Sequence, residues 1–218
     1  MQKLPWSQKL KKQWIALPVV AFSAFLASFS YLHWDIPIAV ACRELSRPIL
    51  DVAEMVTIAG DSKWYFLLFV PAFIFFRFVQ KNRSWAMKML FLVISLSASG
   101  LMSTLIKWIA GRNRPINLFD HGLFGFNFFE AAYEVNSFPS GHSVTVFSLA
   151  AALTILFPRF GFLAFAPAVA IASSRVLLTS HYASDVIAGA IVGIVCTFAV
   201  QYFFDRLNIA HTDQRSLP

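Results

Sequence analysis

Charged residues are scarce in this 218-residue chain, making up 13% of it, whereas 58% of the residues are hydrophobic and 24 are phenylalanine. A soluble domain carries roughly 25% charged residues. The composition therefore excludes an ordinary solvated globule and predicts an integral membrane protein, which we expect to form one domain over residues 1–218. The net charge of +7 does not indicate nucleic acid as a partner, because a basic groove-binding protein does not carry this much apolar sequence.

Cysteine is also rare, since the chain contains only Cys42 and Cys196. Cys42 falls in a connecting segment and Cys196 in the middle of an apolar run, so we expect neither a disulfide framework nor a thiolate metal site. The sequence also has no HExxH, no paired CxxC and no GxxxxGK[ST]. It therefore gives no motif for a bound metal or nucleotide.

Long apolar runs dominate the remaining sequence. Six of them approach the roughly 20 apolar residues that a helix needs to span a bilayer. They are residues 14–33, 64–80, 88–107, 142–158, 160–179 and 184–204. The basic stretch before the first run resembles a signal peptide, but this run exceeds the roughly 7–15 residues of a signal core, so we expect a retained helix. The predicted fold is all-α and polytopic, with six transmembrane helices in a core over residues 14–204.

The distribution of lysine and arginine predicts the orientation. With cytoplasmic tails at 1–13 and 205–218, 11 of the 18 basic residues lie inside and 7 outside. Cytoplasmic loops normally carry this excess. The orientation suits a bacterial inner membrane, with residues 34–63, 108–141 and 180–183 facing the periplasm.

Residues 34–63, between the first two spans, contain charged and apolar residues at helical spacing. The charged set is Arg43, Glu44, Arg47, Asp51 and Glu54, and the apolar set is Leu45, Ile49, Val52 and Val56. This pattern predicts one helix lying in the outer interface. A plain connector that covers the helix ends is an equal alternative.

Polar residues gather at the outer ends of the predicted spans, in residues 107–115, 139–142 and 174–185. A charge near the bilayer centre costs about 2.5–3.5 kcal/mol on insertion scales, so such residues usually pair or have a function. Three of them, Lys107, Arg114 and Arg175, are cations that could bind a phosphate ester and neutralise its transition state. Each cation alone could instead be a snorkelling interfacial residue.

Two further patterns favour phosphate chemistry. Ser140 and Gly141 precede His142 at the expected N-terminus of a helix, which attracts anions, although Pro-Ser-Gly is also an ordinary helix start. His181 and Asp185 are four residues apart, so the carboxylate could fix the imidazole tautomer and leave the other nitrogen as a nucleophile. An isolated pair of this kind is more often a structural hydrogen bond.

Together these residues resemble the three-part signature of the type 2 phosphatidic acid phosphatase superfamily. The parts are Lys-x6-Arg-Pro at 107–115, Pro-Ser-Gly-His at 139–142 and Ser-Arg-x5-His-x3-Asp at 174–185. The resemblance implies that Lys107, Arg114 and Arg175 hold phosphate with Ser140 and Gly141, that His181 attacks phosphorus, that Asp185 orients His181, and that His142 protonates the leaving oxygen. It also implies a metal-independent enzyme without a cofactor, which acts on a phosphorylated lipid in the bilayer and needs no protein partner.

Several points stay open at this stage. Arg112 and Asn113 occupy variable places of the first motif and receive no role. The Phe-rich segment before Pro139 is the best candidate for selecting the substrate, which could be undecaprenyl diphosphate, phosphatidylglycerophosphate, phosphatidic acid or a lipid A phosphate. A membrane serine hydrolase using Ser140, His181 and Asp185 is an alternative, although GxSxG is missing. A transporter lined by these polar residues is another, although its ionisable groups would be expected near the midplane.

Overall fold

The structure of this protein is a computed structural model that describes residues 6–130 and 132–213, so parts of both predicted tails, 1–5 and 214–218, lie outside the described residues. The described residues form helices joined by turns and one isolated β-bridge, without a strand. The α-helices are α1 (Trp6–His33), α2 (Asp35–Arg43), α3 (Arg47–Ile58), α4 (Ser62–Ile74), α5 (Arg83–Ala110), α6 (Pro115–His121), α7 (Gly141–Leu156), α8 (Phe165–Leu177) and α9 (Ala183–Asp213). A π-helix, Phe75–Val79, continues α4, and the 3-10 turns Tyr133–Val135 and Gly161–Ala164 precede α7 and α8.

Each predicted apolar span coincides with a helix, but the helices differ in length. In the part of the chain that the structure describes, three segments are long and apolar enough to cross a membrane: Arg47–Val79, Arg83–Ala110 and Ala183–Arg206. Val20–His33 and Asp35–Arg43, bent by 62°, would together make a fourth. Gly141–Leu156 and Gly161–Leu177 are apolar but shorter. The all-helical membrane fold is thus confirmed, and the number of six spans stays a prediction.

The interfacial location of the helix expected between the first two spans stays a prediction, and residues 34–63 contain two helices where one was expected. α2 ends at Arg43, and α3 begins at Arg47 after Ser46, which has an extended backbone at φ −67° and ψ 148°. Pro48 stands in the first turn of α3. A proline is accepted in the first turn of a helix but has no N–H to bond a preceding turn, so one continuous helix cannot run through this point undisturbed.

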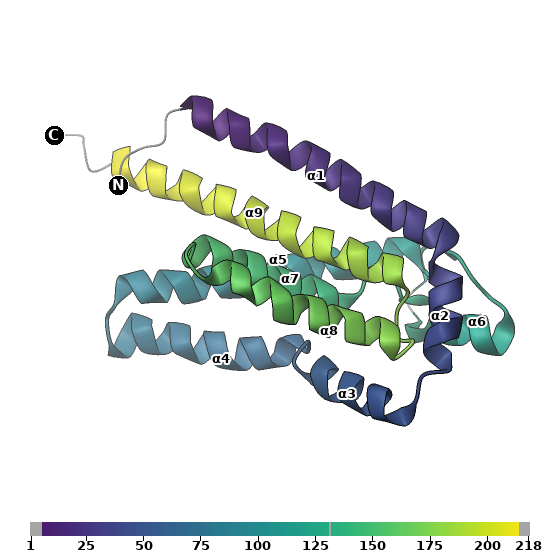
Figure 1. The fold of residues 1–218 in the computed structure, drawn as a ribbon. Helices are drawn as coiled ribbons and strands as arrows, with labels where there is room; N and C mark the ends of the chain where they lie inside the picture. The colour runs from purple at the N-terminus through teal and green to yellow at the C-terminus, as the bar shows by residue number, and fades with distance from the viewer. Residues whose placement is uncertain (1–5, 131, 214–218) are drawn as a thin grey trace.

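α7 lies at the centre of the bundle, where it packs against α5, α8 and α9 (Figure 1). A chain of hydroxyl groups crosses these helices: Ser99 of α5 donates to Ser148 of α7 at 3.0 Å, and Ser148 is 2.8 Å from Thr197 of α9. A Cβ atom added at Gly193 of α9 would lie 2.4 Å from the carbonyl oxygen of Val144. The backbones of α7 and α9 therefore approach closely because position 193 is a glycine.

One end of the bundle collects the polar segments of the chain. The C-terminal ends of α5 and α8 lie there beside the N-terminal ends of α7 and α9, and α2 and α6 cross this end (Figure 1). The N–H group of Ser140 donates to the carbonyl oxygen of Asp185 at 3.0 Å, which ties the turn before α7 to the start of α9. The three motifs of the sequence therefore meet at one end of the molecule.

Candidate active site

His181 lies two residues before α9 and Asp185 lies in its first turn, and their side chains are 4% and 0% exposed. Nδ1 of His181 is 3.6 Å from Oδ2 of Asp185 and 3.4 Å from Oγ of Ser137. The first distance is too long for a direct hydrogen bond but allows a strong electrostatic interaction. Ser137 and the N–H group of Tyr182 donate to the same carboxylate oxygen at 2.6 and 2.9 Å. The Nδ1 edge of the ring thus faces the carboxylate, and Nε2 is on the opposite edge.

Burial favours the neutral form of the His181 ring. Burial lowers the pKa of His181 to about 4; Asp185 opposes this shift, whereas the positive charges of Lys107 and Arg114 add to it. A neutral imidazole keeps a lone pair for attack on phosphorus. Lys107 and Arg114 thus lie close enough to influence the His181 ring electrostatically.

Lys107 and Arg114 meet at one backbone carbonyl. Nζ of Lys107 and Nη2 of Arg114 both donate to the carbonyl oxygen of Asn136, at 2.7 and 3.3 Å. Nη1 of Arg114 also donates to the carbonyl oxygen of Ser180 at 3.1 Å, directly before His181. These bonds bring the first and third sequence motifs together.

Arg175 reaches the site from the last turn of α8. Its Nη1 donates to Oγ1 of Thr57 in α3 at 2.9 Å, and the N–H group of His181 donates to its carbonyl oxygen at 3.2 Å. Among residues 6–130 and 132–213, neither Arg175 nor the pair Lys107 and Arg114 forms a salt bridge with a carboxylate. Three cations that contact only neutral groups leave their charge available to an anion.

Two buried polar groups lack partners, one in the turn before α7 and one in the last turn of α8. Oγ of Ser140 and Nε of Arg175 are buried and make no hydrogen bond to any described residue. A Cβ atom added at Gly141, the first residue of α7, would meet nothing within 4 Å. Buried polar atoms are normally paired, so two unpaired ones beside an open helix N-terminus fit an anion-binding site.

His142 packs against the turn between α3 and α4. A Cβ atom added at Gly60 would lie 2.5 Å from Cδ2 of His142 and 2.7 Å from Cγ2 of Ile171. The charges of Arg175, Arg114 and Lys107 act on the His142 ring, as does that of Asp61. His142 therefore shares the electrostatic surroundings of the three cations, and the α3–α4 turn fixes one side of its ring.

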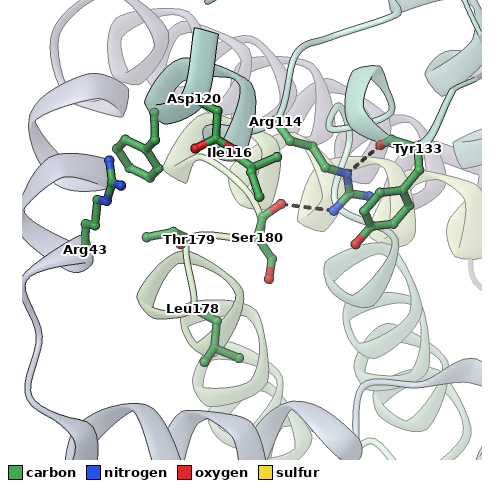
Figure 2. A pocket seen from close by; sticks show the side chains of 9 residues that line it. Arg43, Arg114, Ile116, Asp120, Tyr133, Leu178, Thr179 and Ser180 are labelled. Carbon is green, nitrogen blue, oxygen red and sulfur yellow. Dashed lines mark hydrogen bonds between the residues drawn. The ribbon is translucent and has the colours of Figure 1, made fainter. Parts of the chain in front are cut away.

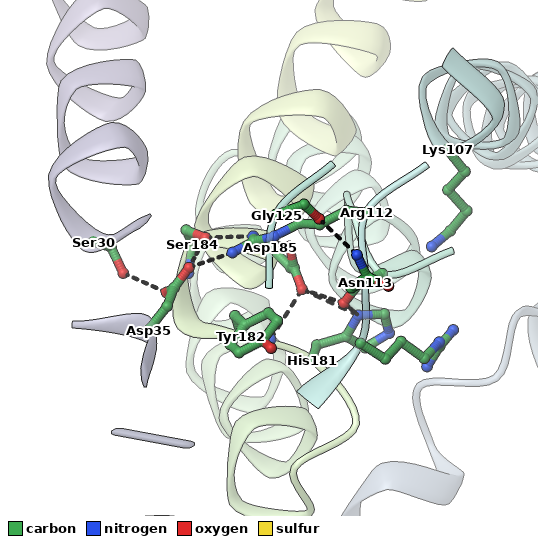
Figure 3. Close-up of polar contacts among 12 residues, drawn as sticks. Ser30, Asp35, Lys107, Arg112, Asn113, Gly125, His181, Tyr182, Ser184 and Asp185 are labelled. Atoms are coloured by element: carbon green, nitrogen blue, oxygen red, sulfur yellow. Dashed lines mark hydrogen bonds and ion pairs between the residues drawn. The ribbon is translucent and has the colours of Figure 1, made fainter. Parts of the chain in front are cut away.

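Arg112, which sequence reasoning left without a role, is the most deeply paired charge of the site (Figure 3). Its side chain is 0% exposed; Nη2 donates to Oδ2 of Asp35 at 2.6 Å, and Nη1 donates to Oδ1 of Asp185. Nη1 also bonds Oγ of Ser184 at 2.7 Å. A charge beside an apolar span usually needs a partner, and this was the only signal in the sequence. The sequence did not show where that partner lies.

The segment between the first two motifs covers this cluster with aromatic rings. The guanidinium carbon of Arg112 lies 4.9 Å from the ring centre of Tyr31 and 5.4 Å from that of Phe126. Phe124 stacks on Tyr31 and packs edge-on against Tyr182.

In the described parts of the chain, no group of three or more His, Cys, Asp or Glu residues could hold a metal ion.

Known structures share this helix arrangement. A crystal structure of a transmembrane PAP2 type phosphatidylglycerolphosphate phosphatase from Bacillus subtilis is similar, with a TM-score of 0.62 and 23% sequence identity over 87% of this chain and 96% of that one. At this level of identity the likeness shows the fold alone.

Sequence comparison identifies the family. Residues 85–209 match the PAP2 superfamily. The chain is 32% identical over 209 residues to a lipid A 1-phosphatase of Rhizobium johnstonii, covering 90% of this chain and 83% of that protein. It is 33% identical over 191 residues to a lipid A 1-phosphatase of Rhizobium etli, covering 83% and 81%. The chain belongs to the PAP2 superfamily, and the prediction of a membrane lipid phosphatase of this kind is confirmed.

Proposed function

We propose that the protein removes a phosphate group from a lipid in two steps, through a phosphohistidine on His181. In the first step, Nε2 of His181 attacks phosphorus while the bond between phosphorus and the lipid oxygen breaks. Protonated His142 gives its proton to the departing oxygen, and the cations Lys107, Arg114 and Arg175 hold the phosphate oxygens. General acid catalysis of this kind is typically worth 10²–10⁴-fold.

In the second step, His142 takes a proton from a water molecule, whose oxygen attacks phosphorus. The bond between phosphorus and Nε2 breaks, inorganic phosphate leaves, and both histidines return to their starting states. Neither step needs a metal ion, because the three cations and the N–H groups near Ser140 and Gly141 supply the positive charge. We therefore propose that the enzyme is metal-independent.

The observation that carries this proposal is the set of unpaired cations beside a neutral histidine. Lys107 and Arg114 meet at the Asn136 carbonyl, one residue before Ser137, which contacts His181. A serine hydrolase would not use these cations, and the hydroxyl of Ser140 makes no bond to His181. A transporter would place its ionisable groups along the membrane, whereas here they gather at one end of the bundle.

We propose a lipid A phosphate as the substrate, because two relatives with this activity in their names cover most of the chain. A pocket of about 340 Å³ opens beside Arg114 and is lined by Arg43, Phe119, Asp120 and Tyr133 among others (Figure 2). It offers polar and aromatic groups to a sugar phosphate headgroup. Undecaprenyl diphosphate, phosphatidylglycerophosphate and phosphatidic acid are the substrates to compare.

We also propose that the site opens at the periplasmic face of a bacterial inner membrane and that residues 1–218 act as a single domain. The excess of basic residues at the opposite end supports this orientation. Labelling of single cysteines introduced at Asp120 and at Lys81 with a membrane-impermeant reagent tests it. Labelling of position 81 alone in intact cells would reverse the orientation.

Phosphate release from these four lipids by the purified protein tests the function. We expect His181→Ala to abolish release from every substrate, and His142→Ala to impair monoester hydrolysis far more than diphosphate hydrolysis, since phosphate is a better leaving group than an alkoxide. Acid-labile label should accumulate on His181 when turnover of His142→Ala is quenched. Label on another residue, or equal losses on both substrate types, would contradict the mechanism.

A further inference from the structure

A buried cluster of three charges lies beside His181, on the side away from Lys107 (Figure 3). Arg112 is paired with Asp35 and Asp185, and all three side chains are fully buried. With both acids ionised, the cluster has one positive and two negative charges. An uncompensated buried charge is costly, so the excess negative charge calls for a compensating cation nearby.

Asp35 accepts hydrogen bonds from two helices, α1 and α9, and from Arg112 in the loop after α5. Its Oδ1 accepts from Oγ of Ser30 at 3.1 Å and from the N–H group of Ser184 at 3.0 Å, and its Oδ2 accepts from Arg112 at 2.6 Å. Asp35 also stands in the first turn of α2, and Ser184 in the first turn of α9. Both helix N-termini favour a negative charge at this place.

The geometry divides the guanidinium of Arg112 between the two carboxylates. Nη2 faces Asp35, and Nη1 faces Asp185. Without Asp35, the whole positive charge of Arg112 would be balanced against Asp185 alone. The carboxylate beside Nδ1 of His181 would then have less negative potential to offer the ring.

We propose that Asp35 is a positioning residue that, by sharing Arg112, leaves Asp185 able to stabilise the cationic ring of phosphorylated His181. This inference rests on the proposed function, in which Nε2 of His181 carries the phosphoryl group. With Nδ1 protonated and Nε2 bound to phosphorus, the ring gains a positive charge. That charge balances the excess negative charge of the cluster, so Asp35 favours formation of the intermediate without touching the substrate.

The test compares Asp35→Asn, Asp35→Glu and the double variant Asp35→Asn with Arg112→Gln, using Asp51→Asn on the exposed face of α3 as the matched control. Three quantities are measured in detergent: kcat, the label trapped on His181, and the titration of the His181 imidazole by NMR. Since removal of one nearby negative charge disfavours a cation, we expect Asp35→Asn to lower kcat about tenfold and the titration midpoint by about one pH unit.

The double variant separates charge from shape. The double variant lacks one anion and one cation, so no guanidinium is paired with Asp185. The titration midpoint of His181 in this variant should therefore rise above that in Asp35→Asn, and kcat should recover in part. Asp35→Glu and Asp51→Asn should keep the wild-type midpoint. If Asp35→Asn does not fold, a midpoint at or above the wild-type value in the double variant still supports the proposal.

Two results would overturn it. Wild-type kcat and His181 titration in a folded Asp35→Asn protein would mean that Asp35 only braces the helices. Charge balance would also be excluded as the role of Asp35 if the His181 midpoint of the double variant were no higher than that of Asp35→Asn. Where the single variant does not fold, a midpoint of the double variant below the wild-type value would have the same meaning. A wild-type enzyme that hydrolyses lipid without any label on His181 would instead refute the phosphohistidine mechanism, and this proposal with it.

Discussion

Substitution of Gly60 by alanine tests whether the α3–α4 turn holds His142, the proposed general acid, in place. The new Cβ atom would lie 2.5 Å from Cδ2 of His142 and 2.7 Å from Cγ2 of Ile171. Carbon atoms in contact are normally about 3.5–4.0 Å apart, so the His142 ring or the turn must move by about 1 Å. A misplacement of about 1 Å at a catalytic group can cost about 10²-fold in rate.

We therefore expect Gly60→Ala to lower kcat for a lipid phosphate monoester by about 10- to 100-fold and to affect a diphosphate less. Overpacking of the turn should also cost about 1–3 kcal/mol of stability. Phosphate release from matched monoester and diphosphate lipids is the assay, together with thermal unfolding in detergent. Gly100→Ala in α5 is the matched control, because a Cβ atom there meets nothing within 4 Å.

A folded Gly60→Ala protein with wild-type kcat on the monoester would refute this reasoning. So would equal losses on both substrate types, because a displaced general acid matters most when the leaving group is an alkoxide. Loss of stability alone, with kcat unchanged, would show that the turn yields without moving His142.

Three further predictions follow from the same site and bundle. His181 should titrate near pH 4, so its ring gains a positive charge only as the pH falls through that value. The measurement is the histidine NMR spectrum, assigned with His181→Asn, and a midpoint at or above about pH 6.5 would contradict the prediction. Gly193→Ala should destabilise the bundle by about 1–3 kcal/mol in thermal unfolding, because its Cβ would lie 2.4 Å from a carbonyl oxygen of α7; a stability equal to that of Gly100→Ala would count against the close packing. Arg43→Ala should raise KM several-fold for a lipid with two phosphate groups and leave kcat unchanged. The control Arg47→Ala on α3 should alter neither value. An unchanged KM in Arg43→Ala would mean that this pocket does not bind the substrate.

The sequence predicted the long helices well because apolar runs and their breakers are local signals. The run 88–107 became α5, Arg83–Ala110, which is stopped by Gly111 with a left-handed backbone at φ 54°. The charge periodicity across residues 43–54 hides the break between α2 and α3, although Ser46 and Pro48 are a recognisable helix start.

The site could be predicted only as far as its motifs reach. Spacing placed His181 four residues before Asp185, but it gave no indication that Ser137 bonds the same carboxylate or that Arg112 pairs with Asp35, 77 positions away. Such contacts depend on how helices pack, which no local pattern records. The partner of a buried charge can be sought in a sequence, but only the fold identifies it.

The shared arginine has a consequence for the order in which the protein is made. Asp35 and Arg112 belong to the first half of the chain or lie just beyond it, whereas Asp185 belongs to the last helix. During synthesis, α2 and the end of α5 emerge before α9, so Asp35 can neutralise Arg112 while the later helices are still absent. Only when α9 docks does the second carboxylate join them and bring His181 into place. In the proposed mechanism, hydrolysis can therefore begin only after α9 has joined the bundle.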